Sequence, residues 1–154
     1  TDPQRECGCS PGEVQRYLSR ISGPLLDRID IHIEVPPLRY RDMAAEAGGE
    51  PAPMIRERVR RARALQADRF KKSKIFCNAA MSPKQIRRHC QVGDEGQRLL
   101  ETAMERLGFS ARAYDRILKV ARTIADLAPE ESLHSQHIAE AIQYRSLDRG
   151  LRGG

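Results

Sequence analysis

The stretch Ser110-Ala-Arg-Ala-Tyr-Asp-Arg-Ile-Leu-Lys-Val-Ala-Arg-Thr-Ile-Ala-Asp-Leu-Ala128 decides the fold, because its apolar residues recur at helical spacing. They form one broad face: Ala113, Tyr114, Ile117, Leu118, Ala121, Ile124, Ala125 and Ala128. Ser110 is a typical N-cap, and Pro129 cannot continue a helix. The stretch therefore predicts an amphipathic helix over residues 111–128, whose apolar face packs against other helices.

Helical patterns also occupy the sequence on both sides of this stretch. The expected helices span residues 54–70, 83–90, 95–107 and 111–128, followed by a last helix that begins at Ser135. Ser82, Asp94 and Ser135 are the expected N-caps, and Gly108 is the expected end of the third helix. The first helix carries a row of apolar residues: Ile55, Val59, Ala62, Leu65 and Ala67. We therefore expect residues 54–145 to form an all-α bundle of about five helices.

The first part of the chain has a different pattern. Helical spacing from Glu13 to Ser22 ends at Gly23-Pro24, and a short turn then leads to Arg28. Residues 29–35 alternate apolar and polar side chains, which is the signature of a half-buried strand. One strand makes no sheet, so its partners must lie outside this sequence and we expect the strand to be irregular. The chain is interpreted as a mainly α fragment of a longer protein, with one short strand.

The composition is that of a globular protein with a basic balance. The chain has 154 residues, of which 40% are hydrophobic and 31% charged, and its net charge is +6. A positive net charge permits an anionic partner such as nucleic acid or a nucleotide. Because the sequence has no run of 18 apolar residues and does not open on a charged-then-apolar leader, we expect a soluble, cytoplasmic protein with no membrane partner.

The cysteines do not make a complete metal motif. Cys7 and Cys9 form a Cys-x-Cys pair, whereas Cys77 and Cys90 stand far apart. Structural zinc sites usually take their ligands from two close pairs. We therefore expect no intact metal site in this chain, with Cys7 and Cys9 as half of one at most. Cys90 lies in a helical pattern and is expected to be a small core residue.

A dense basic run extends from Arg56 to Lys74, with nine basic residues against Glu57 and Asp68. It is either a solvated amphipathic helix or a surface that follows the phosphates of a nucleic acid. The candidate DNA-binding residues are Arg56, Arg60, Arg63, Lys71 and Lys72. Because few aromatic residues lie among them, base stacking is not expected.

Two further arginines, Arg28 and Arg112, are candidates for binding an anion from outside the chain. Arg28 stands at the start of the strand-like run, and its partner is either the carboxylate of Asp27 or Asp30 or a phosphate from outside. Arg112 lies in the first turn of a helix, where the helix dipole disfavours a cation. It is either a surface arginine without a partner or one that shares an outside anion, such as a nucleotide phosphate, with the helix terminus. Arg116 is a further candidate on the same stripe.

Three motifs carry a resemblance to a known family. They are Tyr17-Leu-Ser-Arg-Ile-Ser-Gly-Pro-Leu-Leu-Asp-Arg-Ile-Asp-Ile-His-Ile-Glu-Val35, Leu107-Gly-Phe-Ser-Ala-Arg-Ala-Tyr-Asp-Arg-Ile-Leu-Lys-Val-Ala-Arg-Thr-Ile-Ala-Asp126 and Gln143-Tyr-Arg-Ser-Leu-Asp148. The chain closely resembles the C-terminal third of the magnesium chelatase-like AAA+ ATPases of the ComM (YifB) group. The resemblance divides the chain into the end of an AAA+ core (1–36), a linker (37–53), a helical lid (54–148) and a tail (149–154).

The resemblance implies a hexameric motor that hydrolyses ATP with Mg²⁺ between neighbouring subunits and acts on DNA, in branch migration during natural transformation. Asp27-Arg-Ile-Asp30 resembles the Ser-Arg-Phe-Asp of related replicative helicases, which makes Arg28 the arginine finger for a neighbour's γ-phosphate. Ser110-Ala-Arg112 resembles the Thr-Ala-Arg of the sensor-2 helix, and Arg116 is a second candidate for nucleotide sensing. Cys7-x-Cys9 is similar to the second half of a cysteine-rich segment in the family.

The sequence lacks the motifs that bind the nucleotide itself. It has no G-x-x-x-x-G-K-[S/T] phosphate loop and no apolar strand that ends in paired acids. We therefore expect the chain alone to be a monomer without bound ATP, unable to hydrolyse ATP. The alternative is a self-contained helical domain that binds DNA or protein through the basic face of residues 56–74.

Overall fold

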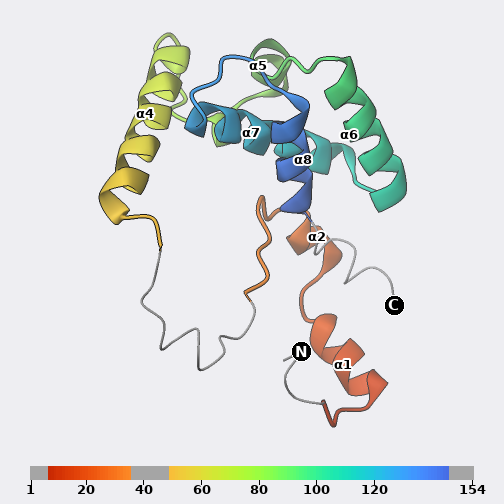
Figure 1. The fold of residues 1–154 in the computed structure, drawn as a ribbon. Coiled ribbons are helices and arrows are strands. Elements are labelled where there is room, and N and C mark those ends of the chain that lie inside the picture. The colour runs from red at the N-terminus through yellow and green to blue at the C-terminus, as the bar shows by residue number, and fades with distance from the viewer. Residues whose placement is uncertain (1–6, 36–48, 146–154) are drawn as a thin grey trace.

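Helices account for most of the residues that the structure describes (Figure 1). The computed structural model describes residues 7–35 and 49–145. The elements are α1 (Pro11–Leu18), α2 (Gly23–Leu26), α4 (Ala52–Phe70), the 3-10 turn η1 (Asn78–Ala80), α5 (Pro83–His89), α6 (Asp94–Leu107), α7 (Ala111–Leu127) and α8 (Ser135–Gln143). α7 lies at the centre and contacts α4, η1, α5 and α8, while α6 packs on α8. The expected all-α bundle is therefore confirmed.

Local side-chain chemistry fixes several helix ends as the sequence predicts. The Ser110 hydroxyl accepts a hydrogen bond from the Ala113 N–H at 3.2 Å and so caps α7. Ser82 caps α5 in a reciprocal arrangement with the side chain of Gln85. Gly108 ends α6 in the left-handed conformation, with φ of 62°, which costs a glycine little.

Two predicted caps are wrong by one residue. The N-caps of α6 and α8 are Gly93 and His134, so Asp94 and Ser135 are the first residues of their helices. Asp94 still favours its helix, because an acidic side chain in the first turn complements the helix dipole. The Ser135 hydroxyl donates to the Glu95 carboxylate at 2.9 Å, so it links α8 to α6 instead of capping α8.

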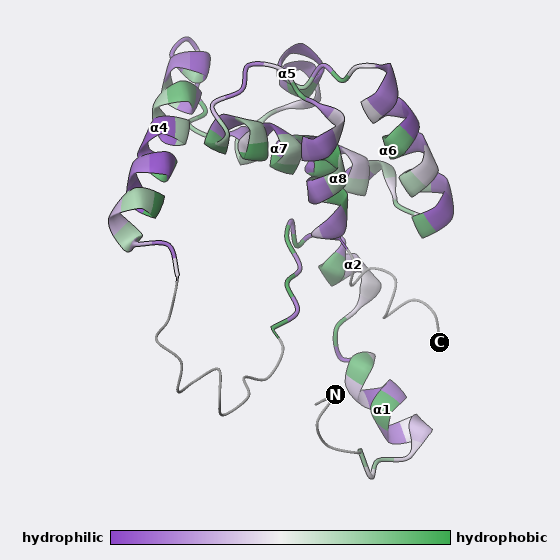
Figure 2. Cartoon of the chain, in the orientation of Figure 1, coloured by the Kyte–Doolittle hydropathy of each residue, from purple (hydrophilic) through white to green (hydrophobic). Residues whose placement is uncertain are grey.

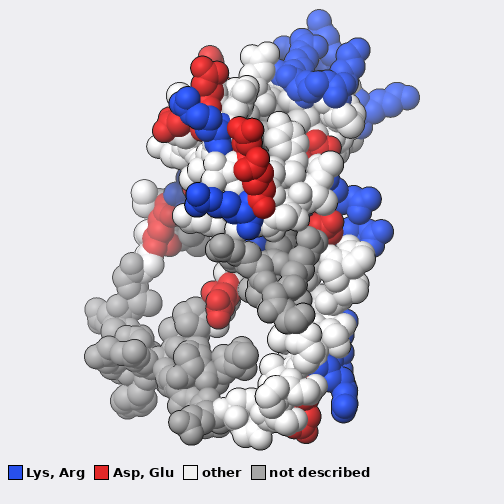
Figure 3. Space-filling model, turned by 90° about the vertical axis from the view of Figure 1, so that its right-hand side faces the viewer, with Lys and Arg blue, Asp and Glu red and all other residues white. Residues whose placement is uncertain are grey.

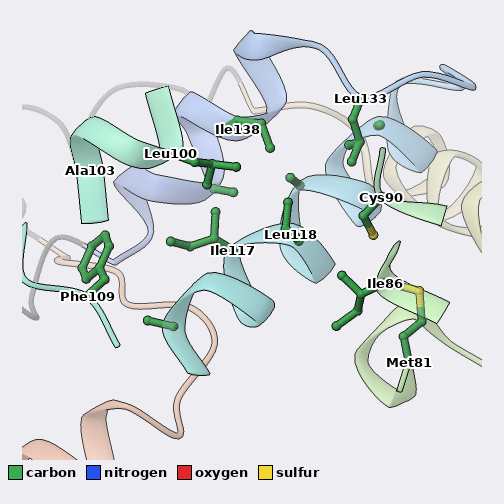
Figure 4. Close-up of a cluster of buried hydrophobic side chains, with 14 of the residues drawn as sticks. Met81, Ile86, Cys90, Leu100, Ala103, Phe109, Ile117, Leu118, Leu133 and Ile138 are labelled. Carbon is green, nitrogen blue, oxygen red and sulfur yellow. The ribbon is translucent and has the colours of Figure 1, made fainter. Parts of the chain in front are cut away.

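The hydrophobic core gathers around α7 (Figure 4). Ile117 and Leu118 are almost fully buried, and burying a side chain of this size contributes roughly 1.5–3 kcal/mol. Their neighbours in the core come from the other four helices of the bundle and from the loops between them: Phe70, Met81, Ile86, Leu100, Phe109, Leu133 and Ile138. Cys90 is buried among them, as predicted. Tyr114 and Ala128, which the sequence placed on the same apolar face, are exposed.

Only the C-terminal half of α4 belongs to this core. Ala62, Gln66 and Phe70 are buried, whereas Ile55 and Val59 are 42% and 46% exposed. The apolar row predicted for this helix is therefore wrong as a buried face. The reason is visible in Figure 1, where the first turns of α4 extend away from the other helices of the bundle.

A buried polar network joins α4 to α7. The Asp126 carboxylate accepts hydrogen bonds from the Arg69 guanidinium at 2.7 Å, from the Asn78 amide at 2.8 Å and from Arg122 Nε at 3.1 Å. Arg122 also donates to the two carbonyls of residues 130–131. Burial alone would raise the pKa of Asp126, but the hydrogen bonds from Arg69 and Asn78 and the charges of Arg69 and Arg122 outweigh it and hold the pKa below its ordinary value. The carboxylate therefore stays ionised at neutral pH.

Residues 29–35 form no strand within the described part of the chain and bend at Asp30. Figure 2 shows the segment as apolar residues alternating with polar ones. The predicted half-buried face is nevertheless wrong: His32 is buried, and Ile33 and Val35 are 67% and 84% exposed. The backbone N–H of His32 donates a hydrogen bond to the Tyr144 carbonyl at 2.7 Å, so the segment contacts the C-terminal end of α8. The expectation of an irregular strand is confirmed.

Some predicted segments cannot be compared with the structure. Most of the linker (37–53), all of the tail (149–154) and the end of the 143–148 motif lie outside the described residues. Among the helices that are described, none is both long enough and apolar enough to cross a membrane.

Candidate functional site

The segment that carries Arg28 is built from α2 and the turn after it. The Ser22 hydroxyl accepts the Leu25 N–H at 3.3 Å and starts the helix, in which Pro24 occupies an early position that needs no N–H. Leu26 is the one residue of α2 that is buried, and it anchors the segment. Arg28 follows in the turn, two residues after this anchor.

Asp27 connects this turn to the helices of the bundle. Its carboxylate accepts a hydrogen bond from the Ser110 hydroxyl, the N-cap of α7, at 3.0 Å. The guanidinium of Arg145 lies 3.6 Å from the other carboxylate oxygen and also donates to the carbonyl of Ile29. Arg145 is only 1% exposed, so these contacts are fixed by a buried group. The turn is therefore held from two sides.

Asp30 makes a second connection to α7. Its carboxylate forms an ion pair with Arg116, one turn further along the helix than Arg112. Both acidic neighbours of Arg28 thus face groups in the bundle and not Arg28 itself. The local salt bridge that the sequence left open for Arg28 is not formed.

The Arg28 guanidinium itself is exposed. Within the described ranges its one hydrogen bond is a long one, 3.4 Å, to the carbonyl of Pro24 in the preceding turn. A single long bond to a carbonyl leaves most of the five donors of the guanidinium directed at solvent. Arg28 is therefore a surface cation on a segment that is anchored next to it on both sides.

Arg112 lies close to the same turn in the fold, since it follows the Ser110 cap by two residues. It is exposed and forms no ion pair with any residue in the described ranges. Arg116 and Lys119, which share its stripe on α7, are already engaged: Arg116 by Asp30 and Lys119 by the Ala79 carbonyl at 2.9 Å. Of the stripe, only Arg112 is left to meet an outside anion.

The basic run of residues 56–74 divides into paired and unpaired side chains. Arg58 pairs with Glu50, Arg60 with Glu57, Lys71 with Asp68, and Arg69 with Asp126. Arg56, Arg63 and Lys72 are exposed, and the described residues offer them no carboxylate. Arg69 is thus a structural residue, and the sequence could not distinguish it from its neighbours.

Sequence reasoning missed the residues that hold the Arg28 segment. Asp27 and Ser110 are 83 positions apart, and Asp30 and Arg116 are 86 apart. Arg145 also went unnoticed, although it is the largest side chain among those that are almost fully buried. The one available signal was the pair of acids around Arg28, of which Asp30 has its basic counterpart, Arg116, on the Arg112 stripe.

The cysteines do not form a metal centre in the described ranges, where no group of three or more His, Cys, Asp or Glu side chains is placed to hold an ion. Cys7 and Cys9 are exposed and lie close together. Hydrogen bonds from the backbone and side chain of Cys9 lower the pKa of Cys7, and the same contact raises the pKa of Cys9. By contrast, burial raises the pKa of the Cys90 thiol to about 11.

The sequence matches two family models. The model for the magnesium chelatase, subunit ChlI, C-terminal family covers residues 49–145, which hold the helical bundle. The model for the magnesium chelatase, subunit ChlI, covers residues 1–43, which hold the Arg28 segment. The two matches together span both connected parts of the site.

Individual relatives match over nearly the whole chain. The competence protein ComM of Haemophilus influenzae is 44% identical over 144 residues, and the uncharacterized protein YifB of Escherichia coli is 40% identical over 144 residues. An uncharacterized protein of Mycobacterium tuberculosis is 37% identical. The matches cover 93–94% of this chain but only 28% of each relative. The chain belongs to the magnesium chelatase, subunit ChlI, family, as a ComM/YifB-like member.

Proposed function

We propose that the chain supplies the arginine finger and the helical lid of a larger hexameric ATPase that moves DNA. The observation that carries the proposal is the state of Arg28: an exposed guanidinium whose two acidic neighbours are both directed to the bundle. In phosphoryl transfer, such a cation stabilises the negative charge that develops on the transferred phosphate. The given sequence holds no phosphate loop, so residues outside it would bind that phosphate, and the proposed finger role assigns the nucleotide to a neighbouring subunit.

Arg112 fits a second role in the same machine. It is exposed in the first turn of α7, beside the Ser110 cap that receives Asp27. The first N–H groups of a helix favour an anion, and a nearby guanidinium adds a permanent positive charge. We propose that Arg112 senses bound ATP and Mg²⁺. Because Arg112 belongs to α7, its position depends on the position of the helical lid. Arg116 would support this site through Asp30 instead of contacting phosphate.

The Asp27 and Asp30 contacts couple these two arginines. A movement of α7 would carry the turn with it, because Asp27 binds the α7 cap and Asp30 binds one turn further on. Nucleotide sensing by Arg112 and charge stabilisation by Arg28 would then change together. The name of the ComM relative refers to competence, which favours DNA as the substrate and branch migration during transformation as the activity.

The test is ATP hydrolysis by the longer protein that contains this chain. Replacing Arg28 by alanine should lower single-turnover hydrolysis by about 10³-fold or more, as loss of an arginine finger does in GTPases, with little change in nucleotide affinity. Arg28→Lys should recover little of the rate, since a lysine lacks the planar fork. Arg16→Ala, which removes an exposed arginine from α1, is the control and should leave the rate unchanged. A loss below tenfold for Arg28→Ala would contradict the proposal.

A further inference from the structure

A hollow of 360 Å³ lies where the end of α4 meets α5. Its walls carry Lys71 and Lys72 from the end of α4, and Lys84, Arg88 and His89 from α5. Figure 3 shows Lys and Arg side chains gathered at the top of the molecule, the end at which α5 lies in Figure 1. The α5 residues were not among the candidates that the sequence suggested.

The charges around the hollow are not balanced. Lys71 is paired with Asp68 at 2.9 Å, and that aspartate is the one acidic side chain among the lining residues. Lys72, Lys84 and Arg88 are exposed and form no ion pair with any described residue. Three cations that pair with no described carboxylate thus surround one concave surface, and their mutual repulsion costs free energy unless an anion is present.

The floor of the hollow is rigid and positive. Arg69 lines it and is fixed by its bidentate contact with the buried Asp126, so it cannot swing away. Burial lowers the pKa of His89, and the positive charges of Arg69, Arg88 and Arg122 lower it further. The imidazole is therefore a neutral hydrogen-bonding group at physiological pH, surrounded by fixed cations.

A second hollow adjoins the first. It has a volume of 240 Å³ and shares Arg69, Arg88 and His89 with the first hollow. Its other charged lining residues are Arg122, whose guanidinium is held by Asp126 and two backbone carbonyls, and the acidic Glu131. Two adjoining hollows that share Arg88 and His89 offer neighbouring positions for more than one phosphate, which suits a chain of phosphates better than a single ion. We call the surface around Lys72, Lys84, Arg88 and His89 the basic groove.

We propose that the basic groove binds the phosphodiester backbone of a nucleic acid strand. Cations of this kind neutralise phosphates and release counterions without reading the base sequence. The aromatic ring at the groove, Phe70, is 3% exposed and cannot stack on a base, so binding here is independent of sequence. The inference rests on the proposed function only in its choice of nucleic acid as the polyanion, because the groove needs no ATP.

The test is direct binding by the chain without nucleotide. The probe is a fluorescein-labelled single-stranded DNA of mixed sequence and about 20 nucleotides, longer than one binding site. Fluorescence anisotropy between about 50 and 200 mM NaCl gives the affinity and its salt dependence. Replacing Lys72, Lys84 and Arg88 together by alanine should lower the slope of log K against log salt by about 2, since each phosphate contact on a single strand contributes about 0.7. The affinity at low salt should fall at least tenfold.

A charge-matched control separates the groove from general attraction. Replacing Arg56, Arg60 and Arg63 by alanine removes an equal number of positive charges from the exposed face of α4. This variant should change the affinity for DNA less than threefold. The conservative variant Lys72→Arg, Lys84→Arg, Arg88→Lys keeps the charge and should keep the binding, and an unchanged circular dichroism spectrum of the alanine variant excludes misfolding as the cause of the loss. Equal losses in the two alanine variants, a larger loss in the α4-face variant, or no binding by the unaltered chain would each overturn the proposal.

The outcome is separate from that of the ATPase experiment. The three alanine substitutions can abolish DNA binding while ATP hydrolysis still depends on Arg28. DNA binding can also depend on the basic groove while hydrolysis does not depend on Arg28. Each proposal can therefore be refuted without the other.

Discussion

Replacing Asp126 by asparagine should destabilise the bundle by about 3 kcal/mol, at the lower end of the roughly 3–5 kcal/mol that breaking a buried ion pair costs. The substitution keeps the shape of the side chain but removes the charge that two guanidinium groups share. The lower end applies for two reasons. The Arg69 side chain is 16% exposed and regains some hydration, and Arg122 keeps its two backbone carbonyl partners.

The assay is urea unfolding of the chain followed by far-ultraviolet circular dichroism at pH 7. The matched control is Asp68→Asn, which removes an aspartate from α4 whose side chain is 76% exposed and, among the described residues, pairs only with Lys71. The control should cost less than about 1 kcal/mol, as exposed ion pairs do. If Asp126→Asn cost no more than the control, the network would not hold α4 against α7, and the reasoning would be refuted.

The same carboxylate predicts a pH dependence with a defined sign. The pKa of Asp126 is lower in the folded chain than its ordinary value of 3.8, so the unfolded chain binds the proton more tightly. Its contribution to stability is fully present above pH 3.8 and is lost as the pH falls through the lower folded pKa. The unaltered chain should therefore lose more stability between pH 5 and pH 3 than the Asp126→Asn variant does.

Three further predictions concern other parts of the chain. A double-mutant cycle on Asp30→Ala and Arg116→Ala should give a favourable coupling of about 0.5 kcal/mol, because the Asp30 side chain is 47% exposed; zero coupling in urea unfolding would contradict the anchoring contact. Cys90 should react with a maleimide at pH 7 at least a hundredfold more slowly than Cys7, since its thiol is buried and its pKa is about 11; mass spectrometry of the labelled chain measures both rates. Gly108→Ala should lower the free energy of unfolding by about 1 kcal/mol, as measured by thermal unfolding. The cost comes from the positive φ and not from a steric clash, because an added Cβ meets no atom within 4 Å.

The sequence predicted the elements that depend on local chemistry. The apolar period of α7, the Ser110 cap and the Gly108 end follow from residues within a few positions of one another, and the structure places them as expected. Cys90 was predicted as a small core residue from its residue type and its place in a helical pattern, and it is buried.

The predictions that failed depended on what the rest of the chain provides. The row that includes Ile55 and Val59 has helical spacing, but helical spacing does not show whether another helix lies beside that part of α4. The first turns of α4 extend away from the other helices, so Ile55 and Val59 are exposed. The alternation of residues 29–35 is equally regular, yet a strand buries a face only where a sheet receives it. In the structure, the hydrogen bond from His32 to the end of α8 decides which side is buried.

The candidate site shows the same division. The sequence identified Arg28 and Arg112 as cations that need a partner, and the structure places both at the surface. It could not show that Asp27 and Asp30 face away from Arg28, because their partners on α7 are more than 80 positions away. The groups that orient a site come from long-range packing, whereas the groups that perform its chemistry stand out by their residue type.

The central claim is that Arg28 completes the active site of a neighbouring subunit, and mixing two inactive variants of the longer protein tests it most directly. One variant carries Arg28→Ala, and the other carries a substitution of the phosphate-loop lysine expected in the remainder of that protein. If the finger acts in trans, the 1:1 mixture should regain hydrolysis at about a quarter of the interfaces of a closed ring, where an intact phosphate loop meets an intact Arg28. A mixture as inactive as either variant alone, in rings shown to exchange subunits, would contradict the claim.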